Sequence, residues 1–243
     1  MKILIKYATR GRADLFKRSI RNIYDTIGVD NFEILISADN DDLEMITKDI
    51  YEFVSSFPNI RLCFGHSESK VHAINRDMQK ASQDWDILVN TSDDMFFIEP
   101  FWGQKLIEDV TKQWPNSTDW FAHYNDGYVR HHLSTLSIMG RQYYERFGYI
   151  YHPEYKSFSC DAEAMYVAQM LEKHHYFGDE KIYFKHLHPA NDKRVKKDEN
   201  YKAASLTTSH DEKVYWKRLN NYFDIQNPKV IPFQEHIGKN LHL

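Results

Sequence analysis

Hydrophobic residues in the first 90 positions alternate between two spacings. Short aliphatic or β-branched runs, typical of buried strands, cover residues 2–7, 32–38, 60–65 and 86–90. Between these runs, apolar residues recur at the spacing of one helical face. The three sets are Phe16, Ile20, Ile23, Tyr24 and Ile27; Leu43, Ile46, Ile50, Phe53, Val54 and Phe57; and Val71, Ile74, Met78 and Ala81. The pattern predicts consecutive strand-helix-strand units, a mainly parallel α/β sheet flanked by helices, with the loops after the strands gathered at its ligand-binding edge.

After residue 90 the alternation breaks down, which predicts a mixed second half. Further strands are predicted near residues 120–124 and 133–139 and over 181–188, and a helix over about 162–173. The apolar stripe of that helix is Ala164, Val167, Ala168 and Leu171. Residues 189–210 are polar and rich in lysine, which predicts an exposed loop or a poorly ordered segment.

Composition and charge narrow the class of protein. The 243 residues, 42% of them hydrophobic, can bury the core of one domain, although two smaller units also fit this length. The net charge is −4, whereas general binders of nucleic acids or anionic membranes are strongly basic, so the chain lacks the charge of that class. Two cysteines, Cys63 and Cys160, are too few for a disulfide scaffold, so we expect a cytoplasmic location. No window predicts a signal peptide or a membrane span.

The strand at residues 86–90 runs directly into an acidic turn in the sequence DILVNTSDDMFF. Asp93 and Asp94 therefore lie at the predicted ligand-binding edge. Carboxylate oxygens are preferred by Mg²⁺ and Mn²⁺, which proteins commonly hold with one or two carboxylates and substrate phosphates. A solvated turn with aspartate as a local cap is the alternative.

The block KVHAINRDMQKASQDWDILVNTSDDMF resembles the Asp-x-Asp region of GT-A glycosyltransferases, particularly family 2-like members. YATRGR resembles their first-loop Thr-Arg-x-Arg pattern, and SADNDD the acidic turn after the second strand. The resemblance implies a single Rossmann-like GT-A domain that moves a sugar from a nucleotide diphosphate donor, by default a UDP-sugar, to an acceptor hydroxyl. It implies a nucleotide-sugar-binding half at 1–98, an acceptor half at 99–188, and a mobile basic loop with a C-terminal extension at 189–243.

The same resemblance assigns roles to individual residues. The implied donor contacts are Thr9, Arg10, Arg12, Asp39, Lys70, Asn75 and Asp93. Surface solvation is the alternative for the two arginines. Because Ser92 stands at the first acidic place, Asp94 becomes the implied direct ligand of Mn²⁺ or Mg²⁺, with Asp93 turned toward the donor.

Downstream, SFSCDAEA resembles the acceptor half of that family, in which an acidic pair at a helix start supplies the catalytic base. Asp161 occupies the place of the base, Cys160 replaces the glutamate often found before it, and Glu163 is a candidate acceptor contact. A positioned base accelerates transfer by on the order of 10²- to 10⁴-fold. The implied reaction is a direct, inverting displacement. The alternative is that Asp161 only caps the helix.

Two further features fit this interpretation. In YFKHLHP, His186 and His188 lie on the same side of a predicted strand and resemble the element whose histidine completes the metal shell, and the choice between them stays open. The basic segment resembles in position the loop that closes over the donor, so diphosphate contacts are expected from Lys193, Arg194, Lys196 or Lys197. A solvated linker is the alternative.

Other functions and several acceptors remain open. A nucleotidyltransferase is a second enzymatic interpretation, although the first loop has only Gly11 where a glycine-rich phosphate cradle is expected. A non-catalytic carbohydrate- or nucleotide-binding module is a third. The acceptor can be a glycan, a small molecule, a protein or a modified DNA base. For DNA, the expected surface joins the basic loop to an aromatic group, namely Tyr143, Tyr144, Phe147, Tyr149 and Tyr151.

Overall fold

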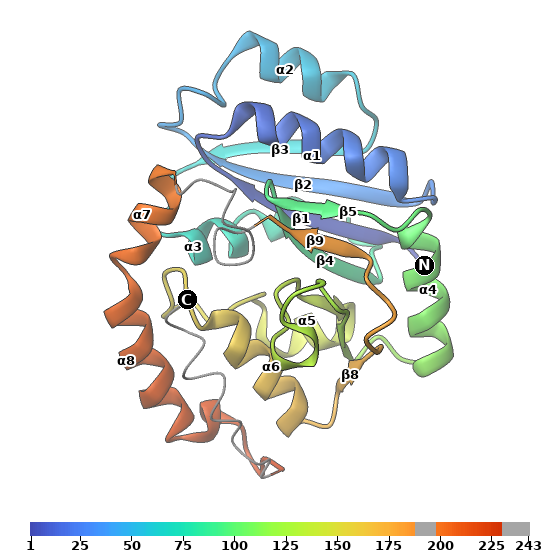
Figure 1. Cartoon of the computed structure of the whole chain (residues 1–243), viewed down its shortest axis with the longest axis vertical. Helices are drawn as coiled ribbons and strands as arrows, with labels where there is room; N and C mark the ends of the chain where they lie inside the picture. The colour runs from blue at the N-terminus through green and yellow to red at the C-terminus, as the bar shows by residue number, and fades with distance from the viewer. Residues whose placement is uncertain (188–197, 230–243) are drawn as a thin grey trace.

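A central mixed sheet organises the chain (Figure 1). The computed structural model describes residues 1–187 and 198–229. Within them the main sheet has seven strands in the order β3-β2-β1-β4-β7-β6-β8. The strands are β1 (Ile3–Thr9), β2 (Phe32–Asp39), β3 (Ile60–Gly65), β4 (Ile87–Ser92), β6 (Phe121–His123), β7 (Ile138–Gly140) and β8 (His174–Tyr176). The first four are mutually parallel and β7 runs antiparallel to β4, which confirms the predicted mainly parallel α/β sheet.

Helices cover both faces of this sheet. They are α1 (Ala13–Thr26), α2 (Lys48–Ser55), α3 (Lys70–Asn75), α4 (Trp102–Gln113), α5 (Arg141–Phe147), α6 (Cys160–Met170), α7 (Glu199–Ser205) and α8 (Thr208–Leu219). Alternate residues of β1 enter opposite cores: Ile3 and Ile5 pack with α1, α2 and α4, whereas Leu4 packs with α3, α6 and α8. No helix within the described residues is long and apolar enough to cross a bilayer.

Two predicted helices are shorter than their apolar spacing suggested. Leu43 is 83% exposed and Ile46 40%, because a turn held by Asp42 precedes the helix and Thr47 caps it. The third set divides after Asn75, because Arg76 is extended and ends α3. Asp77, with a left-handed φ of 69°, then precedes a short 3₁₀ turn (Met78–Lys80). The prediction that the second helix begins at Leu43 was therefore wrong. The prediction of one continuous helix up to Ala81 was also wrong.

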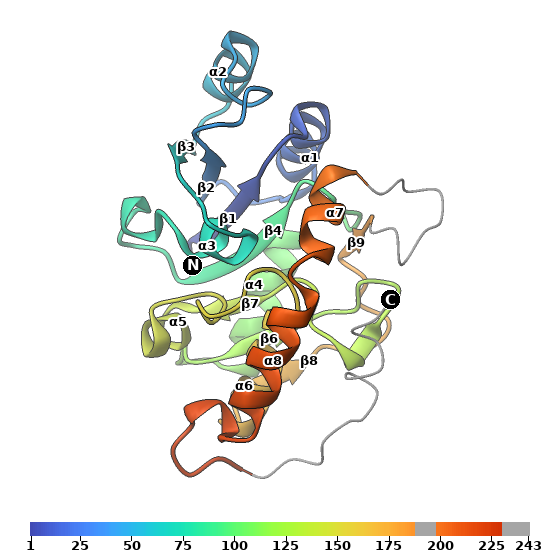
Figure 2. The same ribbon diagram turned by 90° about the vertical axis from the view of Figure 1, so that its left-hand side faces the viewer.

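The second half contains the predicted elements with different bounds and partners. The predicted strand at 133–139 reduces to β7. The strand predicted over 181–188 is β9 (Phe184–His186), which pairs with β5 (Met95–Phe97) in a separate two-stranded sheet. In α6, Ala164 and Leu171 are only partly buried, whereas Met165 and Tyr166 are buried. A single apolar stripe was wrong because α6 lies between the sheet and α8 and buries several sides (Figure 2).

The C-terminal part contains helices where a loop was predicted. Residues 189–197 lie outside the described residues, but 198–210 include α7 and the start of α8. The carboxylate of Asp198 accepts the backbone N–H of Tyr201 and begins α7, while Val214 and Tyr215 anchor α8 in the core. The loop prediction was wrong here because α7 buries none of its own side chains, so no apolar stripe marks it.

Candidate active site

The acidic tip, Ser92 to Asp94, lies where β4 ends and the chain turns into β5. The side chains of Asp93 and Asp94 are only 3% and 5% exposed, so the alternative of a solvated turn is excluded. Because β1 and β4 are parallel neighbours, the end of β1 lies beside this tip. There the Thr9 hydroxyl donates a hydrogen bond of 2.9 Å to Asp93.

Arg12 supplies the positive charge nearest to the tip. Its guanidinium donates to Asp93 Oδ1 over 2.7 Å and lies 3.4 Å from Asp94 Oδ2. Burial and the charge of Asp94 raise the pKa of Asp93 to about 6 despite this contact. Arg12 also makes a two-pronged ion pair with Asp198 and lies over the ring of Tyr201, 4.7 Å from its centroid. The start of α7 therefore closes over the tip.

Asp94 has a separate set of partners on each oxygen. Oδ1 accepts the Ser92 hydroxyl at 2.5 Å and lies 3.6 Å from His186 Nε2, while Oδ2 accepts the Tyr201 hydroxyl at 2.8 Å. Burial opposes ionisation, but the charges of His186 and Lys70 hold the pKa of Asp94 well below its usual range. His186 reaches the tip because β9 pairs with β5 directly after it.

Asp94 and His186 are placed so that each could supply one ligand to a small divalent ion. An Asp94 oxygen and the His186 nitrogen 3.6 Å apart are spaced as neighbouring ligands of one ion, and phosphates and water commonly complete such a shell. No group of three or more His, Cys, Asp or Glu within residues 1–187 and 198–229 is arranged to hold a metal alone. His188 lies outside the described residues, as do Lys193, Arg194, Lys196 and Lys197.

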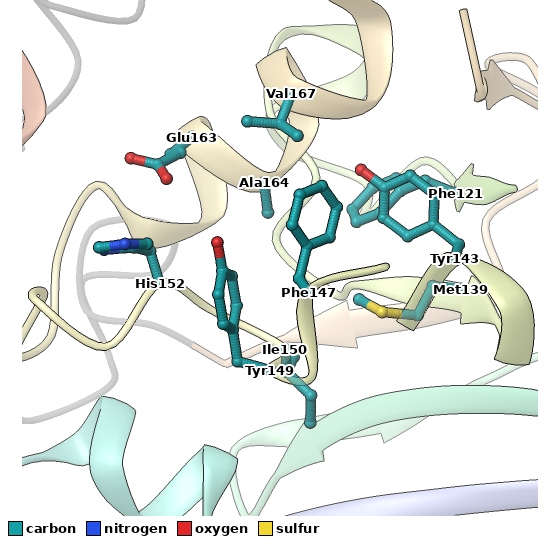
Figure 3. Close-up of a pocket in the computed structure, with 10 residues that line it drawn as sticks. All are labelled: Phe121, Met139, Tyr143, Phe147, Tyr149, Ile150, His152, Glu163, Ala164 and Val167. Atoms are coloured by element: carbon teal, nitrogen blue, oxygen red, sulfur yellow. The ribbon is translucent and has the colours of Figure 1, made fainter. Parts of the chain in front are cut away.

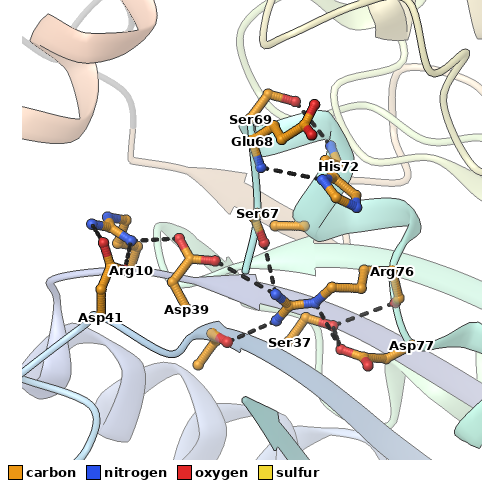
Figure 4. A network of polar contacts seen from close by, with 12 residues as sticks. Arg10, Ser37, Asp39, Asp41, Ser67, Glu68, Ser69, His72, Arg76 and Asp77 are labelled. Atoms are coloured by element: carbon orange, nitrogen blue, oxygen red, sulfur yellow. Dashed lines mark hydrogen bonds and ion pairs between the residues drawn. The ribbon is translucent and has the colours of Figure 1, made fainter. Parts of the chain in front are cut away.

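The loops after β1 and β2 form a polar network at the same edge (Figure 4). Arg10 binds Asp39 at 2.6 Å and also pairs with Asp41. The second oxygen of Asp39 is buried without a hydrogen bond, 3.7 Å from Arg76. Arg76, which was not predicted as a site residue, donates to the Ala38 carbonyl and lies in the NRD segment directly after Asn75.

Asn75 and Lys70 come from α3, on the other side of the site. The Asn75 amide donates to the Tyr151 carbonyl and accepts the backbone N–H groups of Ile150 and Tyr151, so it fixes the loop after α5. Lys70 is exposed, and its charge acts on both Asp94 and Asp161. Lys70 is thus within electrostatic reach of both the acidic tip and the candidate base.

Asp161 is in the first turn of α6, after Ser159 at the cap position. Its carboxylate accepts only the adjacent N–H of Ala162 among the bonds of the described residues. Asp161 is half-buried and has protein packed around it. Burial raises the pKa of Asp161, although the Ala162 N–H and the charge of Lys70 act to lower it. Such a carboxyl suits proton acceptance better than helix capping alone.

Glu163, the candidate acceptor contact, points elsewhere. It accepts hydrogen bonds from Arg218 on both oxygens and from the Tyr155 hydroxyl, and it is 3% exposed. Its carboxylate is therefore engaged in an internal ion pair, which is a structural reason against the acceptor role.

A cavity of ≈ 20 Å³, room for about one water, lies beside this ion pair rather than at the acidic tip (Figure 3). Tyr143, Phe147 and Tyr149 line it. Tyr143 and Tyr151 are only 3% and 4% exposed, so the expected aromatic nucleic-acid surface is not formed by these rings. Tyr143 of α5 and Tyr151, in the loop after α5, both pack in the core that β7 and α6 share.

Comparison with solved structures agrees with this architecture. No family model matches the chain, and no curated protein matches its sequence. The mannosyltransferase PcManGT from Pyrobaculum calidifontis, in complex with GDP-Man and Mn²⁺, is similar with a TM-score of 0.67 and 15% identity, over 100% of this chain and 70% of that one. TarS 1–349 from S. aureus is similar with a TM-score of 0.60 and 12% identity, over 93% of this chain and 73% of that one. Its complex with UDP-GlcNAc gives a TM-score of 0.57, 11% identity, and coverage of 93% and 74%.

The likeness defines the fold. The chain has the GT-A arrangement that the sequence predicted, a single mixed α/β domain with a mainly parallel central sheet. At 11–15% identity the likeness says nothing about which side chains act.

Proposed function

We propose that this protein is a glycosyltransferase that uses a divalent cation and a nucleotide diphosphate sugar. The observation that carries the proposal is the convergence of Asp94, His186, Lys70 and Asp161, which come from four separate stretches of chain. The fold shared with PcManGT, whose complex holds GDP-Man and Mn²⁺, and with TarS supports the same conclusion. A UDP-sugar is the proposed donor, and the likeness to PcManGT makes a GDP-sugar the first alternative.

The two ends of the proposed site have different tasks. Asp94 and His186 would hold Mn²⁺ or Mg²⁺, which neutralises charge on the departing nucleotide diphosphate. Thr9 and Arg12 fix Asp93, which faces the donor. Arg10 and Asp39 lie at the edge proposed for the nucleotide, with the buried unpaired oxygen of Asp39 available to a donor N–H.

Asp161 is the proposed base. Its carboxylate accepts the proton of the acceptor hydroxyl while that oxygen attacks the anomeric carbon and the nucleotide diphosphate leaves. The raised pKa of Asp161 brings it closer to the hydroxyl it must deprotonate. Lys70, whose charge acts on both Asp94 and Asp161, offers its ammonium to the diphosphate. The reaction inverts the anomeric centre, and the product anomer can be read by NMR.

The test separates donor binding from transfer. Thermal stabilisation and nucleotide release are measured with a panel of UDP- and GDP-sugars in the presence of Mn²⁺. Asp94→Ala should lose both signals. Asp161→Asn should keep the stabilisation and lose turnover by on the order of 10²- to 10⁴-fold.

Glu33→Gln is the matched control, because this carboxylate is 8% exposed and accepts the Ser82 N–H at the opposite edge of the sheet. Turnover of Asp94→Ala or Asp161→Asn at the level of this control would remove that residue from its role. A wild-type protein that releases no nucleotide from any donor would refute the proposal. Pyrophosphate release from a nucleoside triphosphate would instead identify a nucleotidyltransferase.

A further inference from the structure

Asp211, in the first turn of α8, is buried next to the loop that precedes the proposed base. Its side chain is 0% exposed. One carboxylate oxygen accepts the backbone N–H of Lys156 at 2.8 Å, and the other accepts those of Ser157 and Phe158 at 2.9 Å each. The Thr207 hydroxyl lies 3.1 Å from the same second oxygen and shares its one proton between this oxygen and the Ala204 carbonyl at 2.8 Å. One carboxylate thus holds three consecutive amides of the segment that enters α6.

The residue that follows this segment is in an unfavourable backbone conformation. Ser159 has a φ of 62°, in the left-handed region of backbone conformation that residues other than glycine rarely adopt. Such a conformation persists where neighbouring contacts determine it more strongly than local preference does. Ser159 is 2% exposed, and Asp161 follows two residues later. The direction in which the proposed base projects therefore depends on how the three amides are held.

The same segment is also tied to the donor side. The carbonyl of Lys156 accepts the backbone N–H of Val71, the residue after Lys70 in α3. The Lys156 peptide thus links Asp211 to the helix that carries Lys70. Arg218, two turns further along α8, binds Glu163 in the first turns of α6. Helix α8 therefore holds the chain on both sides of Asp161, at residues 156–158 before it and at Glu163 after it.

We infer that Asp211 is a positioning residue, which fixes Asp161 relative to Lys70 by holding the loop at residues 156–158. This inference rests on the proposed function, since it assigns the task of Asp211 through the proposed base. Asp211 touches neither donor nor acceptor. Its contribution should appear in the rate of the chemical step and not in donor affinity.

The decisive variant is Asp211→Asn, which keeps the shape of the side chain but replaces one accepting oxygen with an NH₂ group that cannot accept the N–H groups facing it. Misplacement of a reacting group by about 1 Å costs up to roughly 10²-fold in rate. We expect kcat for nucleotide release, from whichever donor in the UDP- and GDP-sugar panel turns over best with Mn²⁺, to fall roughly 10- to 100-fold. The donor KM should stay within about threefold. Glu33→Gln again serves as the control for loss of a buried carboxylate.

A second readout does not depend on turnover. The pKa of the Asp161 carboxyl is measured by ¹³C NMR, with Asp161→Asn identifying its signal. Amide exchange is followed at residues 156–161. In Asp211→Asn we expect faster exchange in this segment alone and a fall in the pKa of Asp161 toward that of an exposed aspartate, because loosening the loop admits water.

An unchanged kcat together with an unchanged Asp161 pKa and unchanged exchange in Asp211→Asn overturns the inference, as does a uniform rise in exchange over the whole chain. A wild-type protein without turnover refutes the proposed function, and the NMR result then decides the role of Asp211 by itself. Should Asp211→Asn fail to fold, Thr207→Val decides in its place. It removes the hydroxyl shared by the Asp211 carboxylate and the Ala204 carbonyl. It should produce the same changes in residues 156–161 at smaller size, and their absence overturns the inference.

Discussion

If Asp94 holds the proposed metal ion, the hydroxyl of Tyr201 competes with that ion for Asp94, and removing the hydroxyl should strengthen metal binding. The hydroxyl donates to Asp94 Oδ2 over 2.8 Å. A hydrogen bond to a charged group contributes about 1.5–3 kcal/mol, and its donor regains a bond to water when displaced, so the lower figure applies. A difference of about 1.4 kcal/mol corresponds to a factor of ten in affinity. We therefore expect Tyr201→Phe to lower the Kd for Mn²⁺ roughly tenfold in the absence of nucleotide.

The substitution isolates the hydroxyl from the ring. Phenylalanine keeps the aromatic face over which Arg12 lies at 4.7 Å, so the cation–π contact is retained. Isothermal titration with MnCl₂ measures the affinity, and electron paramagnetic resonance of free Mn²⁺ checks it. Tyr51→Phe is the control, since Tyr51 is 49% exposed on α2. Equal or weaker Mn²⁺ binding by Tyr201→Phe would show that the hydroxyl does not obstruct the ion, and the competition argument would then fail.

Two buried charges give further predictions. Lys6 is 0% exposed and donates to Ser37, and burial, opposed by the charge of Asp77, lowers the pKa of Lys6 to about 7. The unfolded chain, with a pKa near 10.4, binds a proton that the folded chain lacks between about pH 7 and 10, so stability rises with pH there by about 5 kcal/mol at most. Lys6→Met should flatten this slope in urea unfolding measured at pH 7 and 9.5, and an unchanged slope would contradict it. Arg218→Met should cost about 3–5 kcal/mol at pH 7 because it leaves Glu163 buried and unpaired. Adding Glu163→Gln should recover most of that loss in the same unfolding measurement, and a loss that persists in the double variant would contradict the ion-pair explanation.

The parallel half of the fold was predictable because its strands are buried on both faces. Such strands appear as continuous aliphatic runs, and β1, β2 and β4 carry them. By contrast, β8 reads His-His-Tyr and β5 is only three residues long, so neither carries a strand signal of its own. Helix α4 was missed although Trp102, Leu106 and Val110 recur four residues apart, a signal that was present in the sequence.

In the candidate site, too, some residues could be predicted from the sequence and others could not. Asp93 and Asp94 were found because strand and carboxylates are adjacent in sequence. Arg12 was predicted to meet the nucleotide, which stays a prediction, and in the structure Arg12 contacts both carboxylates. Tyr201 and Asp211 were missed because each acts on residues more than fifty positions away, and no local spacing marks such pairs.

The reach of Arg12 has a consequence for how the protein acquires its site during synthesis. Its contacts with Asp93 and Asp198 close loops of 81 and 186 residues. The entropic cost of closing a loop rises only slowly with its length. A contact between distant residues can form only after both residues have been synthesised. A ribosome-bound chain that has already formed β1 and β4 still lacks α7, so the covered acidic tip is completed only after residue 201 has emerged. Nascent chains stalled before and after that point should therefore differ in how readily the tip exchanges with solvent.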